Sequence, residues 1–261
     1  MKNRIGVAIS VYDKGNFVKT NINIIKNLWN IDPYISICCN HDATFDKLRN
    51  IDGVSVVRGA DLPFDQKWQL RLRQHDCIKK SVSQACQNSE YVIHWHGDAF
   101  ALSEKSIVEI VDYMDSKNIW FAGRGFWREF KSPKVPVGDI DDHFFIMRSE
   151  LVIQSGIFED VLWSDIERMA TMGVCSEGIL AVLVQSAIAD ESVYIYSDMS
   201  ECFVLPSSRT DSRYSDNVAH RTLPPVNFDR ERKFLHCDDL ACLEQIFNDE
   251  KIDTSLICKE L

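Results

Sequence analysis

Short apolar runs alternate with helical patterns through the first 122 residues of the chain. Runs rich in β-branched and aromatic residues predict strands, and apolar residues spaced three or four apart between them predict helices. The predicted strands are Ile5–Val11, Tyr34–Cys39, Val54–Val57, Tyr91–Trp95 and Ile119–Ala122, and the predicted helices begin near Asn16, Asp65 and Ser103. This alternation is typical of a mainly parallel sheet that is covered by helices on both faces.

The pattern becomes less regular after residue 122, but it still predicts strands and helices. Strands are predicted at His143–Met147 and Val193–Tyr196, and helices from Ser149 to about Gly156, from Ser176 onwards and around Leu243. No internal repeat and no clean linker divides the sequence. We therefore expect one domain that spans residues 1–261.

Composition and charge exclude several classes of protein. The 261 residues are 45% hydrophobic and 26% charged, which is ordinary for a packed chain. The net charge of −10 argues against bulk nucleic-acid binding, which requires a dense cationic surface. No run approaches the ~20 apolar residues of a transmembrane segment. The apolar run at the N-terminus passes straight into polar residues without a cleavage site, so it predicts a strand rather than a signal peptide.

The cysteines predict the redox environment of the chain. There are 9 of them, an odd number, and no CxxC pair occurs. Most lie in apolar runs, as Cys38 and Cys39 do. We therefore expect reduced, buried thiols in a cytoplasmic protein.

Polar residues follow three of the predicted strands. They are Tyr12-Asp13, Asn40-His41-Asp42 and His96-Gly97-Asp98. Because the carboxyl ends of parallel strands meet at one edge of a sheet, we expect these residues to open onto one ligand site. The sequence contains neither GxGxxG nor GxxxxGK[ST], so the usual dinucleotide and P-loop sites are absent.

The segment Tyr91–Phe100 is the strongest local signal for chemistry. Asp98 and the imidazole of His96 are both able to bind a divalent cation such as Mn²⁺ or Mg²⁺. Such a cation would neutralise a leaving diphosphate, as transfer from a nucleotide sugar requires. The alternative is a strand end with two histidines, one of them buried, and an Asp near a helix.

With these residues the chain resembles GT-A-fold, nucleotide-sugar-dependent glycosyltransferases (family 2-like). The resemblance covers roughly residues 3–200. It rests on an N-terminal strand that runs into Ile9–Asp13, a helix, a second strand followed by an Asp, a long helix, and a strand that carries a D-x-D type motif. His96 stands where the first Asp is usual, so Asp98 is the only carboxylate of a degenerate motif. The resemblance implies an α/β, GT-A-like (Rossmann-like) fold with a mixed, mainly parallel central sheet flanked by helices.

The resemblance also implies that the two halves of the chain bind different substrates. Residues 1–122 would bind the nucleotide sugar, and residues 123–261 would bind the acceptor and close the site. The implied donor-binding residues are Val11, Tyr12, Asp42, Arg73, His96, Gly97 and Asp98. The implied metal ligands are Asp98, His96 and the late His236, for which His220 is a competitor. Arg71 and Arg73 equally fit an exposed basic helix face.

Two carboxylates are candidates for the catalytic base. Glu177 lies where inverting members of the family carry a Glu or Asp, at the start of a helix after the acceptor loop. The same position suits an acidic residue that stabilises the helix dipole. Asp142 is the second candidate, within a rival carboxylate cluster that also contains Asp139 and Asp141.

A predicted loop that is rich in basic and aromatic residues, Gly123–Pro136, is the candidate acceptor site. Trp127 and Phe126 are framed by the cations Arg124, Arg128 and Lys131. Aromatic faces stack on sugars, and the cations suit an anionic acceptor. His143 is the second acceptor-binding candidate.

We therefore expect a glycosyltransferase that moves a hexosyl-type sugar from a UDP-, GDP- or dTDP-type donor to a glycan, lipid-linked or other hydroxyl, as in polysaccharide biosynthesis. Mn²⁺ or Mg²⁺ would assist. One alternative is a non-catalytic GT-A-like module that binds nucleotide or glycan. The other is a dinuclear-zinc hydrolase built on His94, His96 and Asp98, although Ala99 replaces the last His of an HxHxDH motif.

Overall fold

The structure is a computed structural model that describes residues 2–60, 67–126, 139–158, 163–172, 174, 176–188, 190–198, 226–237 and 239–260. The candidates Trp127, Arg128, Lys131 and His220 lie outside these ranges. None of the helices in the described ranges combines the length and the apolar character needed to cross a membrane.

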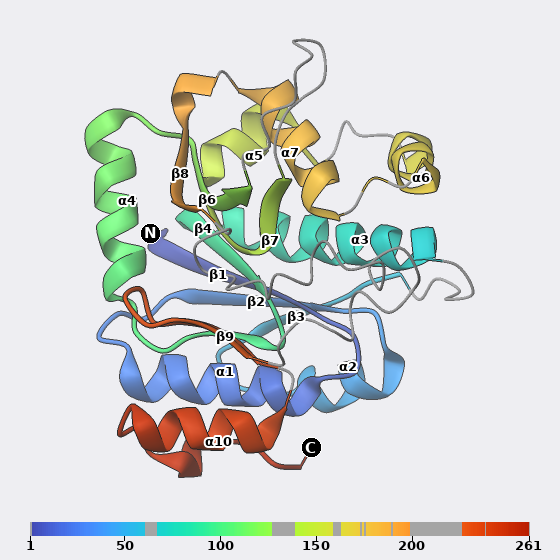
Figure 1. Ribbon diagram of the computed structural model, residues 1–261. Coiled ribbons are helices and arrows are strands. Elements are labelled where there is room, and N and C mark those ends of the chain that lie inside the picture. The colour runs from blue at the N-terminus through green and yellow to red at the C-terminus, as the bar shows by residue number, and fades with distance from the viewer. Residues whose placement is uncertain are drawn as a thin grey trace, which may run out of the picture.

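A seven-stranded sheet forms the centre of the molecule (Figure 1). In spatial order its strands are β3 (Ser55–Arg58), β2 (Tyr34–Cys39), β1 (Asn3–Val11), β4 (Ser89–His96), β7 (Asp139–Arg148), β6 (Phe121–Phe126) and β8 (Val193–Asp198). Only β7 runs antiparallel to its neighbours β4 and β6, and the other described pairings are parallel. The sheet therefore continues through β7 into the second half of the chain.

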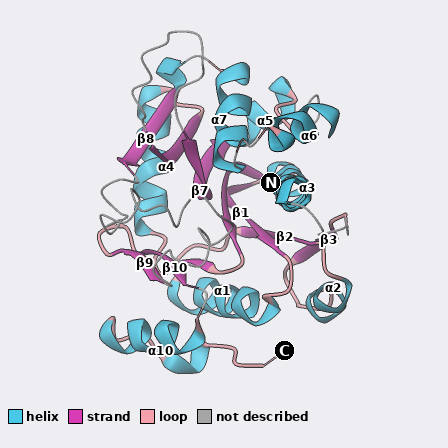
Figure 2. Ribbon diagram, turned by 45° about the vertical axis from the view of Figure 1, so that its right-hand side comes forward, coloured by secondary structure: helices cyan, strands magenta, loops and turns pink. Residues whose placement is uncertain are grey.

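Helices cover both faces of this sheet, as Figure 2 shows. The helices on one face are α1 (Gly15–Leu28), α2 (Asp42–Leu48), α4 (Lys105–Lys117) and α10 (Leu240–Asp249), and those on the other are α3 (Lys67–Cys86), α5 (Ser149–Ser155), α6 (Trp163–Thr171) and α7 (Ser176–Ala187). Successive residues of β1 enter opposite cores, because side chains alternate along a strand. Val7 and Ile9 pack toward α1, and Ala8 packs toward α3.

A second, three-stranded sheet brings distant residues to the end of β4. Its strands are β5 (Ala99–Ala101), β10 (Phe234–Cys237) and β9 (Val226–Asp229), and both pairings are antiparallel. His236 pairs with Ala99, and the Cys237 N–H donates a hydrogen bond of 2.9 Å to the Asp98 carbonyl. The late histidine is thus fixed beside the motif. Short 3-10 turns at Asp190–Ser192 and Thr254–Leu256 complete the described elements.

The predicted fold class, α/β with a mainly parallel central sheet flanked by helices, is confirmed. The order of elements that carried the GT-A resemblance is also present, from β1 through α1, β2 and α3 to β4. The sequence patterns missed α2, α6, β5, β9 and β10, which are short or lie in irregular segments.

Candidate functional site

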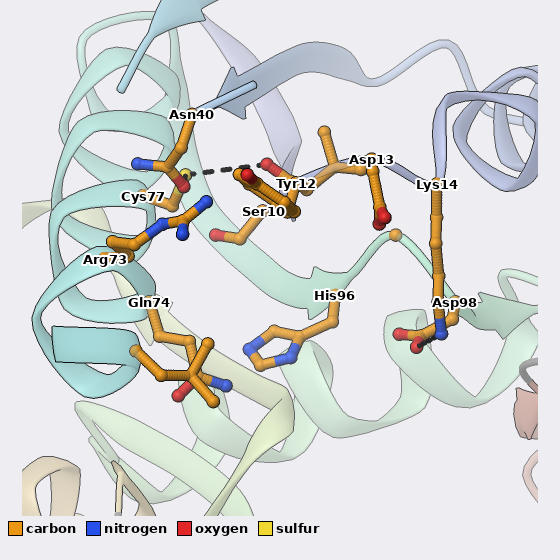
Figure 3. Close-up of a pocket in the computed structure, with 13 residues that line it drawn as sticks. Ser10, Tyr12, Asp13, Lys14, Asn40, Arg73, Gln74, Cys77, His96 and Asp98 are labelled. Atoms are coloured by element: carbon orange, nitrogen blue, oxygen red, sulfur yellow. Dashed lines mark hydrogen bonds and ion pairs between the residues drawn. The ribbon is translucent and has the colours of Figure 1, made fainter. Parts of the chain in front are cut away.

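The three predicted strand ends meet at one cavity of about 390 Å³ (Figure 3). It opens at the carboxyl ends of β1, β2 and β4 and is bounded by α3. The lining residues are Ser10, Val11, Tyr12, Asp13, Lys14, Asn40, Leu70, Arg73, Gln74, Cys77, His96, Gly97 and Asp98. This is the edge at which parallel α/β sheets bind their ligands.

The turn after β4 is held by hydrogen bonds to β1 and to α1. The Gly97 N–H donates to the Ser10 carbonyl at 2.8 Å, and the buried Asn21 amide donates to the Gly97 carbonyl at 3.0 Å. A Cβ atom on Gly97 would lie 3.0 Å from Val11 Cγ2, so the close approach of the two segments favours glycine here. These contacts fix where His96 and Asp98 point.

One side of the cavity is formed by Tyr12, Arg73 and Asn40. The guanidinium carbon of Arg73 lies 3.7 Å from the centroid of the Tyr12 ring, which is a close cation–π contact. Arg73 itself is only 3% exposed. Asn40 is held by Cys77, whose thiol donates to Asn40 Oδ1 at 2.7 Å.

Asp42 lies away from this cavity. It opens α2, and its half-exposed carboxylate pairs with Arg58 on β3. Of the three residues that directly follow β2, Asn40, His41 and Asp42, Asn40 is the one that lines the cavity. Arg71 also points elsewhere, because its guanidinium donates to the Ala170 carbonyl at 2.8 Å.

Asp98 lies on the side of the cavity opposite Arg73, beside Lys14 (Figure 3). Lys14 Nζ is 2.6 Å and His236 Nε2 is 3.6 Å from the same oxygen, Asp98 Oδ2. Burial alone would raise the pKa of this carboxyl group. The contact with His236 and the charges of His236 and Lys14 instead hold the pKa well below its usual value. Asp98 is therefore an anion.

Three imidazoles form a row beside Asp98. The ring centroids of His96 and His143 are 4.5 Å apart, and those of His143 and His236 are 4.6 Å apart. Burial would lower the pKa of His143, but its contacts with Asp141 and Asp142 raise it well above the usual value. Burial lowers the pKa of His96. The row thus combines a protonated and a neutral imidazole.

Asp141 and Asp142 on β7 have different surroundings. Asp141 accepts hydrogen bonds from Arg124 Nε at 2.6 Å and from the His143 N–H at 3.0 Å. Asp142 Oδ2 lies 3.6 Å from His96 Nε2, and neither atom has a hydrogen-bond partner within the described ranges. Asp141 therefore anchors β7, whereas Asp142 faces the site.

The structure corrects the prediction for Arg124. We expected it on an exposed basic loop, but it is 2% exposed in β6. Its charge is compensated inside the molecule by the Asp141 carboxylate, because a buried cation requires such a partner.

Glu177 opens α7 and is close enough to the β7 carboxylates to feel their charge. Burial is the largest cause that raises its pKa, and the negative charge of Asp142 adds to it. The Ser176 hydroxyl donates to Glu177 Oε2 at 3.1 Å. A carboxyl group with a raised pKa in such a place is suited to proton transfer.

His94 has both ring nitrogens engaged. Nδ1 lies 3.0 Å from the Asp142 carbonyl, which only accepts, so this nitrogen carries the proton. Nε2 then accepts from the Ser10 hydroxyl at 2.8 Å. His94 is fully buried. In this structure it is a link between β1, β4 and β7 and does not face the cavity as a metal ligand.

The remaining residues fit a divalent cation. Ligand atoms of His96, Asp98 and His143 all lie within 4.8 Å of one another, and so do those of Asp141, Asp142 and His143. The buried atoms His96 Nε2 and Asp142 Oδ2 have no hydrogen-bond partner within the described ranges, and both are of the types that bind metal ions. His96, Asp98 and His236 were the ligands predicted from the sequence, and in the structure His143 and Asp142 lie beside them.

Three residues of the site were not predicted for the place they hold. Lys14 was not singled out, Asn40 was noted only as part of a strand end, and His143 was assigned to the acceptor. One signal was available for His143. Asp141, Asp142 and His143 stand directly before an apolar run, so polar groups enter the core there.

The fold was compared with those of known proteins. The sequence matches no protein-family model and no curated protein. The fold is similar to a cytidylyltransferase from Leptospira borgpetersenii, with 14% identity, 99% of this chain and 98% of that chain covered, and a TM-score of 0.45. It is similar to mouse xyloside xylosyltransferase 1, with 10% identity, 91% and 98% coverage and a TM-score of 0.48.

A third similar structure is a mannosyltransferase from Pyrobaculum calidifontis in complex with GDP-Man and Mn²⁺. The identity is 11% and the TM-score is 0.40. The similar region covers 60% of this chain and 47% of that chain. At such identities and scores the similarity transfers no substrate or reaction to this chain.

Proposed function

We propose that this protein is a glycosyltransferase that moves a sugar from a nucleotide-sugar donor to an acceptor hydroxyl. The observation that supports this most is the combination of a cavity at the carboxyl ends of β1, β2 and β4 with a histidine–carboxylate cluster at its edge. Two cations, Lys14 and Arg73, line the cavity beside the carboxylates Asp13 and Asp98, and cations suit an anionic diphosphate. Residues 1–122 would form the donor side, and residues 123–261 the acceptor side.

The donor would lie across the cavity from Arg73 to Asp98. The face of Tyr12, the amide of Asn40 and the guanidinium of Arg73 offer stacking and hydrogen bonds to a nucleoside. Val11 and Gly97 would shape the cavity floor. Lys14 and the metal site would then receive the diphosphate.

The metal ligands would be Asp98 and His96, with His143, His236 and Asp142 as the further donors within reach. A divalent ion bound there supplies positive charge to the leaving diphosphate. A donor set rich in imidazole favours Mn²⁺ over Mg²⁺, because Mg²⁺ prefers oxygen ligands.

Glu177 would act as the base on the acceptor side. Its raised pKa makes it a better proton acceptor than an ordinary glutamate once it is ionised. Asp142, beside it, is the alternative base, but its pKa is lowered, which suits a permanent anion better than a proton carrier. An acceptor would enter from the side of α7.

A panel of nucleotide sugars, tested by thermal shift with and without Mn²⁺, tests the proposal. Selective stabilisation by one nucleotide class is expected, because a ligand that binds only the folded state raises its unfolding temperature. Release of sugar from an isotope-labelled donor then tests turnover. No stabilisation by any nucleotide sugar would contradict the proposal.

A non-catalytic nucleotide-binding module is the second candidate. One observation favours it: Lys14 already pairs with Asp98, the only carboxylate of the motif, and His236 approaches the same oxygen. Stabilisation by a nucleotide sugar without any release of labelled sugar would select this candidate.

A further inference from the structure

We propose that Lys14 is an exchangeable counter-ion, which neutralises Asp98 in the free protein and moves to the donor diphosphate when a divalent cation binds Asp98. This inference rests on the proposed function. It assigns a role to a residue that the sequence motif does not include. It also makes cation and diphosphate binding interdependent.

The geometry puts Lys14 and a cation in competition for one carboxylate, that of Asp98. Lys14 Nζ is 2.6 Å from Asp98 Oδ2, and His236 Nε2 approaches the same oxygen at 3.6 Å. A divalent ion binds carboxylate oxygens at about 2 Å. The ammonium group and the ion would then be about 5 Å apart or less, and their repulsion is strong in a partly buried site.

The ammonium group of Lys14 has somewhere to go. Lys14 lies between the end of β1 and the start of α1 and lines the cavity itself. Its side chain is 37% exposed, so it is not locked in place, and its four-carbon stem allows the charge to swing. A diphosphate in the cavity would offer it oxygen acceptors in place of Asp98.

A purely structural role does not account for the pair. The turn that carries Asp98 is already held by the Cys237 N–H, which donates to the Asp98 carbonyl, and by Asn21, which donates to the Gly97 carbonyl. The half-exposed Lys14 adds little to such a turn. Its contact is with the carboxylate of Asp98, one of the groups that a cation would use.

The test measures two affinities of the full chain for K14M, each without the other ligand. Mn²⁺ binding is followed by the electron paramagnetic resonance signal of free Mn²⁺, and binding of inorganic pyrophosphate is followed by calorimetry in the presence of a chelator. We expect K14M to bind Mn²⁺ about tenfold more tightly and pyrophosphate about tenfold more weakly than wild type. The two shifts have opposite signs, which a general loss of structure would not produce.

Two further variants serve as controls. K26M removes a lysine of α1, the helix that follows Lys14. Its ammonium group binds the Asp52 carbonyl, and the substitution should leave both affinities unchanged. K14R keeps the charge and should restore pyrophosphate binding. If K14M weakens both affinities or changes neither, the exchange is overturned. If the opposite shifts occur but no nucleotide sugar binds, the exchange stands and the proposed glycosyltransferase fails.

Discussion

His96 on β4 and Asp142 on β7 face each other with Nε2 and Oδ2 3.6 Å apart. Both atoms are buried, and neither has a hydrogen-bond partner within the described part of the chain. A buried polar atom without a partner costs about 1–3 kcal/mol. Because burial keeps His96 neutral, one ring nitrogen retains a lone pair. A divalent cation is a ligand that satisfies the imidazole and the carboxylate together.

Replacement of Asp142 by Asn should therefore weaken cation binding. The substitution preserves shape and removes the charge that faces His96. We expect the affinity for Mn²⁺ to fall by about 10- to 100-fold, measured by titration calorimetry. Asp165→Asn, which alters an exposed carboxylate on α6 paired with Arg168, should leave the affinity unchanged. Unaltered Mn²⁺ binding by D142N would show that Asp142 is not a ligand.

The strand ends of this site were predictable because they depend on local patterns. The apolar run that ends at Val11 and the one that ends at His96 are both buried on two faces, and parallel strands bring such ends to one edge. The positions of Tyr12 and Asp98 at one cavity follow from this rule. Tyr12 and Asp98 were each proposed only from the type of residue that follows a predicted strand.

Contacts between distant segments were not predictable in the same way. Lys14 meets Asp98 across 84 positions of sequence, and no periodicity in either segment encodes that pair. Arg124 was assigned to a loop because its neighbours are Gly, Trp and Arg. Its burial depends on Asp141, which is supplied by the next strand of the sheet. Whether a charged side chain is buried depends on partners from neighbouring strands, and the sequence of a single segment does not reveal those partners.

His94 offers a test of the zinc-hydrolase alternative. Since its nitrogens bind Ser10 and the Asp142 carbonyl, His94→Phe leaves both partners unsatisfied. We expect the free energy of unfolding to fall by about 1–3 kcal/mol in denaturant titrations. The metal content per chain, measured by elemental analysis after loading with Zn²⁺ or Mn²⁺, should remain that of wild type. Loss of one metal per chain would instead favour a dinuclear site that includes His94.

His75 on α3 should make stability depend on pH. Burial is the main cause that lowers its pKa from 6.5 to about 4. Below pH 6.5 the unfolded chain binds a proton that the folded chain refuses, so stability is lost as the pH falls toward 4. The difference between the two pKa values corresponds to about 3 kcal/mol, of which about 2 kcal/mol is lost by pH 5.

The variant that isolates this contribution is His75→Phe, measured by urea unfolding from pH 7.5 to pH 4.5. It should lose less stability than wild type over this range, because the titrating group is gone. Phe158→Leu is the matched control, because the centroid of the Phe158 ring lies 5.9 Å from that of the His75 ring and the Phe158 side chain does not titrate. It should lower stability by the same amount at every pH. Parallel pH curves for wild type and H75F would contradict the assignment.

Glu177 should set the acidic limit of activity. A base works only when ionised, and burial together with the charge of Asp142 raises the pKa of Glu177 above 4.5. Transfer should therefore decline as the pH falls through a value above that of an ordinary glutamate. A cation at Asp142 would offset the smaller cause, but burial, the larger one, would remain.

Glu177→Gln should reduce kcat by about 10²- to 10⁴-fold and remove the acidic limb of the pH profile. The thermal shift produced by the donor should be unchanged, because this residue lies outside the residues that line the donor cavity. Glu150→Gln, at an exposed position on α5, should retain both the rate and the profile. Turnover by E177Q that equals wild type, with the acidic limb intact, would exclude Glu177 as the base. A loss of turnover in D142N with normal Mn²⁺ binding would then transfer that role to Asp142.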